Sequence, residues 1–193
     1  MTDLSSARMI GGIGSILLML VIVPSVGPIL SIVGFVLVLL ALKYVSTAVQ
    51  QPAIFQNALY AVIIGIIGAV AALVLGGAAL LTALTGGFGE LGPGQPEPDF
   101  FTFLTGILIA VLVAWVFSVA SSIFLRKSLN LTGDALGIKL FKTAGLLVLL
   151  GAALTIILVG FIISIIAYVL MAVAFFQIPQ VGGQPPPPPP PPP

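Results

Sequence analysis

Two long stretches without a charged residue, 9–42 and 143–176, most constrain what this chain can fold into. As one straight helix, each run of about 34 residues would measure about 50 Å, whereas the hydrocarbon core of a bilayer is about 30 Å thick. Prolines and a glycine at 24–28 interrupt the first run, because proline cannot continue a helix and glycine permits a tight reversal. The same length argument places a turn near 158–160 in the second run. Each run is therefore predicted to form a hairpin of two short helices, 9–23 with 28–43 and 143–158 with 160–177.

The two predicted hairpins resemble copies of one unit. At a constant offset, residues 26–42 align with the apolar segment that begins at Val159, so that Gly27 meets Gly160 and Ser31 meets Ser164. In both copies the glycine and the serine stand four positions apart just after the turn, and small residues at this spacing let helices approach closely. We therefore expect these four residues to be helix-packing positions.

The composition is typical of a membrane protein. Hydrophobic residues make up 60% of the chain and charged residues 6%, with a mean hydropathy of +1.31, whereas a soluble domain has about 25% charged residues. This number of polar residues is too small to cover the core of a soluble protein. Most of the apolar surface must therefore face lipid. The chain has no cysteine or histidine, which removes the thiolate and the imidazole, and its net charge of +1 gives no reason to expect nucleic-acid binding. We predict no catalytic, cofactor or metal site and no enzymatic activity.

Two longer apolar segments, 56–84 and 100–125, lie between the hairpins. Small residues recur along both segments at helical spacing, namely Gly65, Gly68, Ala72 and Gly76 in the first and Ser118 and Ser122 in the second. These residues are predicted to pack helices of one chain together, with dimerisation through the same face as the alternative. The chain is thus predicted to be an all-α membrane protein with six transmembrane segments, in which two short hairpins flank two longer helices within a transmembrane domain at 9–178.

Polar segments are few. The loop at 85–99 contains Glu90, Glu97 and Asp99, and carboxylates in a loop could bind a cation such as calcium. Because their spacing matches no known loop motif, a solvated loop is the favoured interpretation. A short polar head at 1–8 precedes the first hairpin, and the tail at 179–193 ends in nine prolines, which can form only an extended polyproline helix. The tail is predicted to be disordered, with a ligand for a proline-binding module as the alternative role.

The most basic stretch is 126–142, which contains Arg126, Lys127, Lys139 and Lys142. It is predicted to be a polar connection that sets the orientation of the protein in the membrane. The alternative is a short helix in the headgroup region, capped by Thr132 or Asp134, whose lysines reach lipid phosphates.

The distribution of charge predicts how the chain is threaded. With six spans and a cytoplasmic start, Arg8, Lys43 and the basic stretch all fall on the cytoplasmic side, while both hairpin turns and the acidic loop fall outside. The protein is therefore predicted to be a multi-pass protein of the cell membrane with both termini in the cytoplasm. The two hairpins then run in the same direction, as parallel repeats.

Several short motifs resemble a known family. They are the Gly-Gly-Ile-Gly-Ser run at 11–15, the turn and helix at 24–34, Ile-Phe-Gln-Asn-Ala at 54–58, Gly-Ile-Lys-Leu-Phe-Lys-Thr-Ala-Gly at 137–145, and Val-Ala-Phe-Phe at 173–176. In these motifs the chain is similar to the domain of unknown function 996 family, uncharacterised integral membrane proteins found mainly in archaea. The resemblance covers about residues 9–178 and implies a multi-span protein of archaeal type. It implies no activity and no catalytic residues.

Three functions follow from these observations. The favoured hypothesis is a non-enzymatic scaffold or accessory subunit that acts by association, as a homo-oligomer or with another membrane protein, because small-residue stripes are present and catalytic groups are absent. The alternative is a small transporter or channel for a neutral solute, lined by Ser31, Ser118, Ser121, Ser122 and Ser164. Proton coupling through the membrane core is not expected, because no predicted span contains an ionisable acid or base. A membrane enzyme ranks last.

Overall fold

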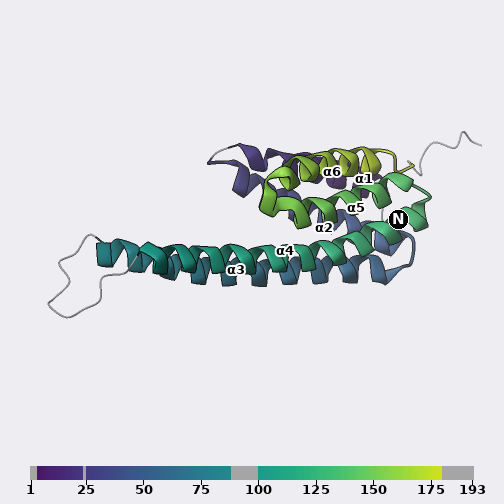
Figure 1. Cartoon of the computed structure of the whole chain (residues 1–193). Coiled ribbons are helices and arrows are strands. Elements are labelled where there is room, and N and C mark those ends of the chain that lie inside the picture. Colours follow the sequence, from purple (N-terminus) through teal and green to yellow (C-terminus); the bar gives the residue numbers. More distant parts are fainter. Residues whose placement is uncertain (1–3, 24, 88–99, 180–193) are drawn as a thin grey trace, which may run out of the picture.

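The described part of the chain is entirely helical. The computed structural model describes residues 4–23, 25–87 and 100–179, and within them six α-helices and two short 3-10 turns account for all regular structure. The predicted polyproline tail and the carboxylates Glu90, Glu97 and Asp99 lie outside the described residues, as does the beginning of the polar head. The all-α prediction is therefore confirmed for the described part (Figure 1).

The helices form three hairpins. The elements are, in order, α1 (Leu4–Met19) with the 3-10 turn η1 (Leu20–Ile22), α2 (Gly27–Ala48), α3 (Pro52–Gly87), α4 (Phe100–Leu136), α5 (Lys139–Leu154) with the 3-10 turn η2 (Thr155–Ile157), and α6 (Val159–Phe176). Five helices, α2 to α6, are long and apolar enough to cross a membrane, whereas α1 is shorter, with 16 residues. The predicted count of six spans therefore stays a prediction.

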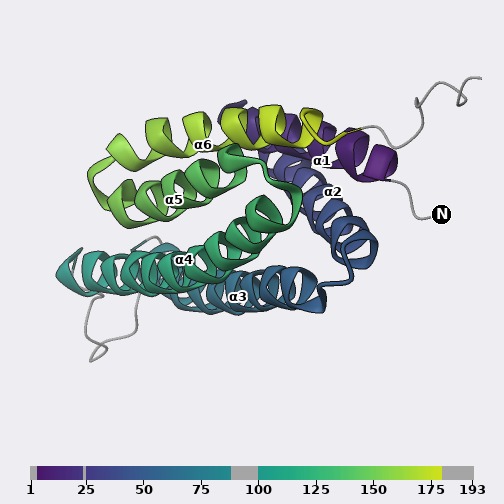
Figure 2. The same ribbon diagram turned by 90° about the vertical axis from the view of Figure 1, so that its right-hand side faces the viewer.

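The six helices close into a ring. Each helix packs against the next one in the chain, and α1 closes the ring by packing against α6. Viewed end-on, the order around the ring follows the order in the sequence (Figure 2). Viewed from the side, the α3–α4 hairpin forms one layer and the two short hairpins form a second layer on top of it (Figure 1). Helices α3 and α4 have 36 and 37 residues and extend well beyond the tips of the short hairpins (Figure 1).

The two short hairpins share one local plan, which supports the predicted duplication. Each contains a 3-10 turn followed by a residue in the left-handed region, Ser25 with φ 67° and Leu158 with φ 62°. These two residues are equivalent at the offset that aligns Gly27 with Gly160. Both glycines lie against backbone atoms of the preceding turn, where a Cβ would collide, so the close reversal requires glycine. Both tips point to the same end of the molecule, as expected for parallel repeats (Figure 1).

Several predicted boundaries are wrong, because a charged residue does not by itself end a helix. Helix α2 continues through Lys43 to Ala48, and α3 begins at Pro52. The connection between the helix predicted at 28–43 and the segment predicted at 56–84 is therefore only 49–51, where Gln50 has φ 55°. The basic stretch predicted to be a connection or a separate interfacial helix is mostly the end of α4, which continues to Leu136. Backbone hydrogen bonding along a helix continues past a membrane boundary as long as no proline or left-handed residue interrupts it.

The end of α4 also corrects the predicted helix cap. The Thr132 hydroxyl donates a hydrogen bond to the Ser128 carbonyl within α4, at 2.9 Å, so it caps no helix. Asp134 lies in the same helix and forms an ion pair with Lys142 of α5. The helix ends instead at Gly137, which has φ +70°, a conformation that glycine adopts without steric cost.

The interior of the ring is filled at one end only. Seven side chains there are almost completely buried and form what we call the apolar plug: Leu42, Val45, Ile54, Leu129, Phe141, Phe175 and Ile178. They come from the end of α2, the start of α3, the end of α4, the start of α5, the end of α6 and, for Ile178, the residues just after α6. The rings of Phe141 and Phe175 pack edge to face with centroids 5.0 Å apart. The plug therefore occupies the same end of the ring as the basic residues.

Candidate functional site: a hydroxyl-lined cavity inside the ring

Toward the hairpin tips, the interior of the ring contains a cavity of about 310 Å³, the central cavity. Helices α4, α5 and α6 contribute most of its walls, and η1, α2 and η2 complete them. The lining consists of six hydroxyl side chains and seven apolar ones. These residues are Val21, Phe35, Ser118, Ser121, Ser122, Leu125, Val148, Ala152, Thr155, Phe161, Ser164, Ile165 and Tyr168.

Helical periodicity explains why so many hydroxyls converge. Ser121 and Ser122 follow Ser118 by three and four residues in α4, so all three lie toward one face of that helix. Ser164 and Tyr168 are four residues apart in α6 and likewise share one face. The closed ring turns these two faces toward the same space, and Thr155 of η2 adds a sixth hydroxyl.

The six hydroxyls differ in their hydrogen bonds. Three of them donate to backbone carbonyls: Ser121 to Ala61 at 2.7 Å, Ser122 to Val119 at 2.7 Å and Thr155 to Gly151 at 2.6 Å. For the other three, Ser118, Ser164 and Tyr168, there is no hydrogen bond to any described residue. Ser118 is exposed, and Ser164 and Tyr168 are half-buried. These three hydroxyls are therefore available to a molecule inside the central cavity.

Two neighbouring cavities adjoin the central one. The α2–α3 side cavity, of about 370 Å³, contains Ser31 and shares Val21, Phe35 and Tyr168 with the central cavity. The α4–α6 side cavity, of about 510 Å³, lies between α4 and the tip of the second hairpin and shares Ser118, Thr155 and Phe161 with it. The three cavities thus form a series of neighbours that share lining residues, with the hydroxyls concentrated in the middle one.

No residue that lines these three cavities is charged. Serine, threonine and tyrosine hydroxyls each donate one hydrogen bond and accept others, so they suit neutral partners with hydroxyl, carbonyl or amide groups. A nucleophilic serine needs an adjacent base, and no carboxylate, imidazole, thiol or amine is among the lining residues. The lining of the central cavity therefore offers hydrogen-bonding groups that suit an uncharged molecule and no counter-charge for a charged one.

Trp115 connects the cavity region of α4 to α5. Its indole Nε1 donates a hydrogen bond to the Ala153 carbonyl at 3.1 Å, and its side chain also lines the α4–α6 side cavity. This bond bridges two helices next to the cavity.

The structure places the predicted packing residues in two groups. On α3, Gly68 lies against Phe117, Gly65 against Ser121 and Gly76 against Ala110, so the α3 stripe packs against α4 of the same chain. Ala72 is half-buried on the same helix. Gly27 and Gly160 lie at the hairpin turns, and Gly151 and Ser164 are in close contact between α5 and α6. This arrangement favours packing within one chain over dimerisation through the stripe.

Of the serines predicted to line a solute route, Ser118, Ser121, Ser122 and Ser164 meet in the central cavity, whereas Ser31 lines the α2–α3 side cavity. Thr155 and Tyr168 also line the central cavity but are not among the residues predicted from the sequence. Tyr168 stands one helical turn after Ser164, and this i, i+4 relation is the signal that could have identified it. No local signal marks Thr155, because its position in the cavity depends on the turn between α5 and α6.

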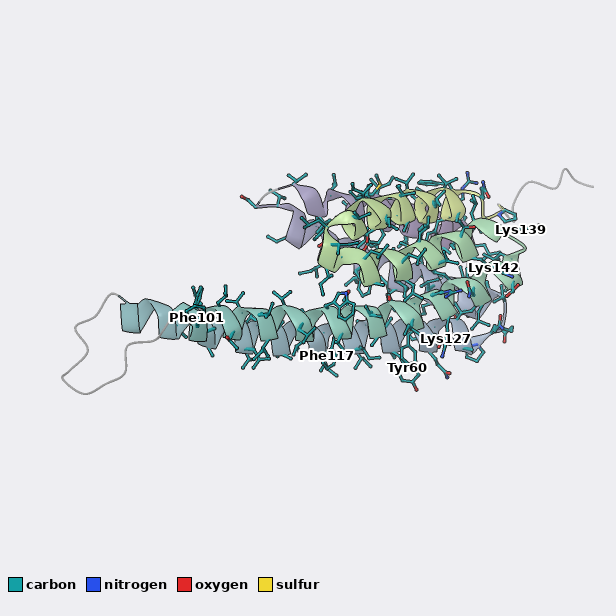
Figure 3. All side chains as sticks on the ribbon, viewed as in Figure 1. Tyr60, Phe101, Phe117, Lys127, Lys139 and Lys142 are labelled. Atoms are coloured by element: carbon teal, nitrogen blue, oxygen red, sulfur yellow. The ribbon has the colours of Figure 1, made fainter. Side chains whose placement is uncertain are left out.

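The basic residues gather at the opposite end from the cavity. Lys127, Lys139 and Lys142 lie at the end of the molecule where α4 passes into α5 (Figure 3). Lys142 pairs with Asp134, Lys127 lies over the Phe124 ring at 5.2 Å from its centroid, and Arg126 is half-buried next to Gly145. Lys139 and Lys142 belong to the first turn of α5 and not to a separate interfacial helix. Their role at lipid headgroups stays a prediction.

A helical ring with five long apolar helices and an uncharged internal cavity has the features of an integral membrane protein. Residues 30–169 match the family described as "Protein of unknown function (DUF996)", and the chain belongs to this family. The uncharacterised protein MJ1644 of Methanocaldococcus jannaschii is 32% identical over 179 residues, which cover 92% of this chain and 94% of that relative. The expected family is thus confirmed. No solved structure matches the chain.

Proposed function

We propose that this is a non-enzymatic membrane protein that binds a small neutral molecule in the central cavity and transports it without proton coupling through the membrane core. The observation that supports this most is the convergence of six hydroxyls, three of them unpaired among the described residues, on one uncharged cavity. In the sequence analysis a transporter ranks second to a scaffold. The shared cavity is the reason to reverse that order.

The apolar plug favours a transporter over an open channel. Leu42, Ile54, Leu129, Phe141 and Phe175 have no exposed surface, so the ring interior is closed between the cavity and the basic end. A molecule in the central cavity therefore reaches the basic end only if helices move apart. Such a closed gate next to a binding site is what alternating access requires.

The residues around the cavity do not favour proton-coupled transport, because none of them is an acid or base suited to carry a proton. Ionisable groups within membrane spans usually mark proton pathways, because they are costly to bury and are retained for function. The cavity lining has none, and the basic residues together with Asp134 lie at the far end. The neutral molecule would therefore move down its concentration gradient, without coupling to protons.

The test uses the absence of cysteine in this chain, which makes any introduced cysteine the sole thiol. The Ser164→Cys variant in proteoliposomes should pass labelled glycerol or a short-chain monoacylglycerol, and alkylation with the small neutral reagent N-ethylmaleimide should block that flux. In the Ser128→Cys control, the residue lies buried in the packed end, so neither reaction nor block is expected. A flux that equals that of empty liposomes, or that survives complete alkylation of the Ser164→Cys variant, would contradict the proposal.

The scaffold remains the second candidate, because one observation favours it. Helices α3 and α4 expose Leu73, Val74, Leu81, Phe101 and Leu108, and the end of this pair that contains Phe101 extends beyond the short hairpins (Figure 3). At 1.5 Å per residue, helices of 36 and 37 residues measure about 55 Å, so they are longer than the hydrocarbon core of about 30 Å. A homo-oligomer or another membrane protein could cover this surface. Disulfide cross-linking of a Leu73→Cys variant in native membranes, together with an absence of flux, would support the scaffold.

A further inference from the structure

The two side cavities differ in chemistry from the central cavity that they adjoin. Several residues line the α2–α3 side cavity but not the central cavity, and all of these are apolar except Ser31. The residues that line the α4–α6 side cavity but not the central cavity are also apolar, apart from the indole N–H of Trp115. That indole N–H is already bonded to Ala153. Polar groups are therefore concentrated in the middle of the series, and apolar walls extend from it on two sides.

The outer walls of both side cavities include strongly exposed apolar side chains. In the α2–α3 side cavity, Ile32 is 66% exposed and Ile66 is 59% exposed. In the α4–α6 side cavity, Leu158 is 74% exposed. Each side cavity is thus an opening in the side of the ring. The apolar plug closes the interior toward the basic end. A molecule therefore reaches the central cavity from the side, through a side cavity, and not from the basic end.

This layout fits one class of molecule. A chain of carbon atoms would lie against the apolar walls of a side cavity, and a hydroxyl or carbonyl headgroup would pair with Ser118, Ser164 and Tyr168. A charged headgroup would enter a lining without any counter-charge, and burial of an unpaired charge is strongly unfavourable. A pure hydrocarbon would leave the three hydroxyls unpaired.

We infer that the ligand of the central cavity is a neutral single-chain amphiphile, such as a long-chain alcohol, an isoprenoid alcohol or a monoacylglycerol, which enters sideways from the bilayer. This inference rests on the proposed function and specifies its substrate class. Tyr168 has a particular place in it, because it lines both the central cavity and the α2–α3 side cavity. Its side chain therefore stands at the border between the headgroup region and the chain region, where its hydroxyl would select for a polar headgroup.

The test is photolabelling of the full-length protein in phosphatidylcholine nanodiscs with a hexadecanol that carries a diazirine in its chain. We expect labelled peptides from the side-cavity walls on α2, α3, η2 and the adjoining part of α4. Excess unlabelled hexadecanol should suppress this labelling, whereas hexadecane and hexadecyltrimethylammonium should not. Labelling that hexadecanol fails to suppress would reflect general partitioning into the bilayer and would overturn the inference.

Variants that each remove a single hydroxyl test which side chains contact the headgroup of the bound amphiphile. Tyr168→Phe removes only one hydroxyl and should weaken hexadecanol competition about fivefold, as expected for the loss of one hydrogen bond. Ser164→Ala should have an effect of similar size, and the combination of both a larger one. Tyr60→Phe is the control, since Tyr60 is an exposed residue of α3 that lines none of the three cavities and points away from the bundle (Figure 3). An equal effect of Tyr60→Phe and Tyr168→Phe would contradict the assignment.

The outcomes separate this inference from the proposed function. If hexadecanol does not compete but glycerol flux is still blocked by alkylation of the Ser164→Cys variant, the ligand is a water-borne solute and only the inference fails. If there is neither competition nor flux, both fail. If hexadecanol competes and charged analogues do not, the substrate class is established.

Discussion

The two halves of the six-helix ring are built from the same helices but filled in opposite ways. At the basic end, Phe141, Phe175 and Leu129 have no exposed surface and close the interior. Toward the hairpin tips, the same helices enclose a cavity of about 310 Å³. Close packing is the rule in protein interiors, and voids larger than a water molecule are few. The contrast places the tightly packed core at the basic end, whereas the tip half contains the cavity in which we propose that a ligand binds.

The hydroxyl residues show the same contrast in their hydrogen bonds. In the packed half, Ser128 of α4 donates to the Ile54 carbonyl of α3 at 2.7 Å, and Thr132 donates to Ser128. In the hollow half, Ser118 and Ser164 make no hydrogen bond to a described residue. Ser121 of the central cavity also bonds across helices, to the Ala61 carbonyl of α3, so the hollow half combines a bonded serine of this kind with the unpaired Ser118 and Ser164. The number of serines in a membrane helix therefore does not predict whether they pack helices or bind a ligand. Their hydrogen-bond partners decide this.

The largest expected effect concerns the side of the membrane on which each half lies. Ser25 and Gln50 are exposed turn residues at opposite ends of α2, so each can carry the sole cysteine of the chain. If the basic end is cytoplasmic, a membrane-impermeant maleimide should label the Ser25→Cys variant in intact cells and the Gln50→Cys variant only after permeabilisation. Labelling with the opposite pattern would invert the predicted threading. Equal labelling of both variants in intact cells would place the two ends on one side.

The second-largest expected effect is the difference in stability loss when a side chain is truncated in the packed half or in the hollow half. Phe141→Ala removes a fully buried ring that packs against Phe175, whereas Phe161 of the cavity wall is 52% exposed. Phe141→Ala should cost about 3 kcal/mol, toward the low end of the range for buried phenylalanine because lipid tails are as apolar as the core. Phe161→Ala should cost less than about 1 kcal/mol. Unfolding by SDS in mixed micelles, followed by circular dichroism, measures both. Equal costs would mean that the two halves are equally well packed.

The smallest expected effect separates the two kinds of serine. Ser128→Ala should destabilise the protein by about 0.6–1 kcal/mol, the typical contribution of a hydrogen bond between membrane helices. Ser164→Ala breaks no hydrogen bond within the described residues, so its unfolding curve should match that of the unaltered protein. Both variants are compared in the same micelles. A loss of stability for Ser164→Ala as large as that for Ser128→Ala would indicate that Ser164 has a structural role.

Much of the fold follows from local patterns. The turns near 24–28 and 158–160 are where the structure has Ser25 and Leu158 in the left-handed conformation, because proline, glycine and hydrophobic length act over a few residues. The boundaries at Lys43 and Arg126 are wrong for a related reason. Charge predicts where lipid ends, whereas helix ends depend on backbone hydrogen bonding, which stops only near Gln50 and Gly137.

The candidate site is only partly visible in the sequence. Serines can be recognised as the polar residues of apolar helices, and four of the five predicted to line a route meet in the central cavity. Ser31 is separated from them because it lies at the α2–α3 side cavity. Thr155 and Tyr168 join the site only through the turn of the second hairpin and the closure of the ring.

The sequence by itself determined the class of the protein, the hairpins and the separation of the basic residues from the hairpin turns. These depend on hydrophobic length and on charge, both of which can be counted along the chain. Only the tertiary structure decided that one half of the ring is closed by the apolar plug while the other contains a cavity. A cavity arises where side chains from several helices fail to fill a shared volume, and that volume is defined only once helices distant in sequence are packed together.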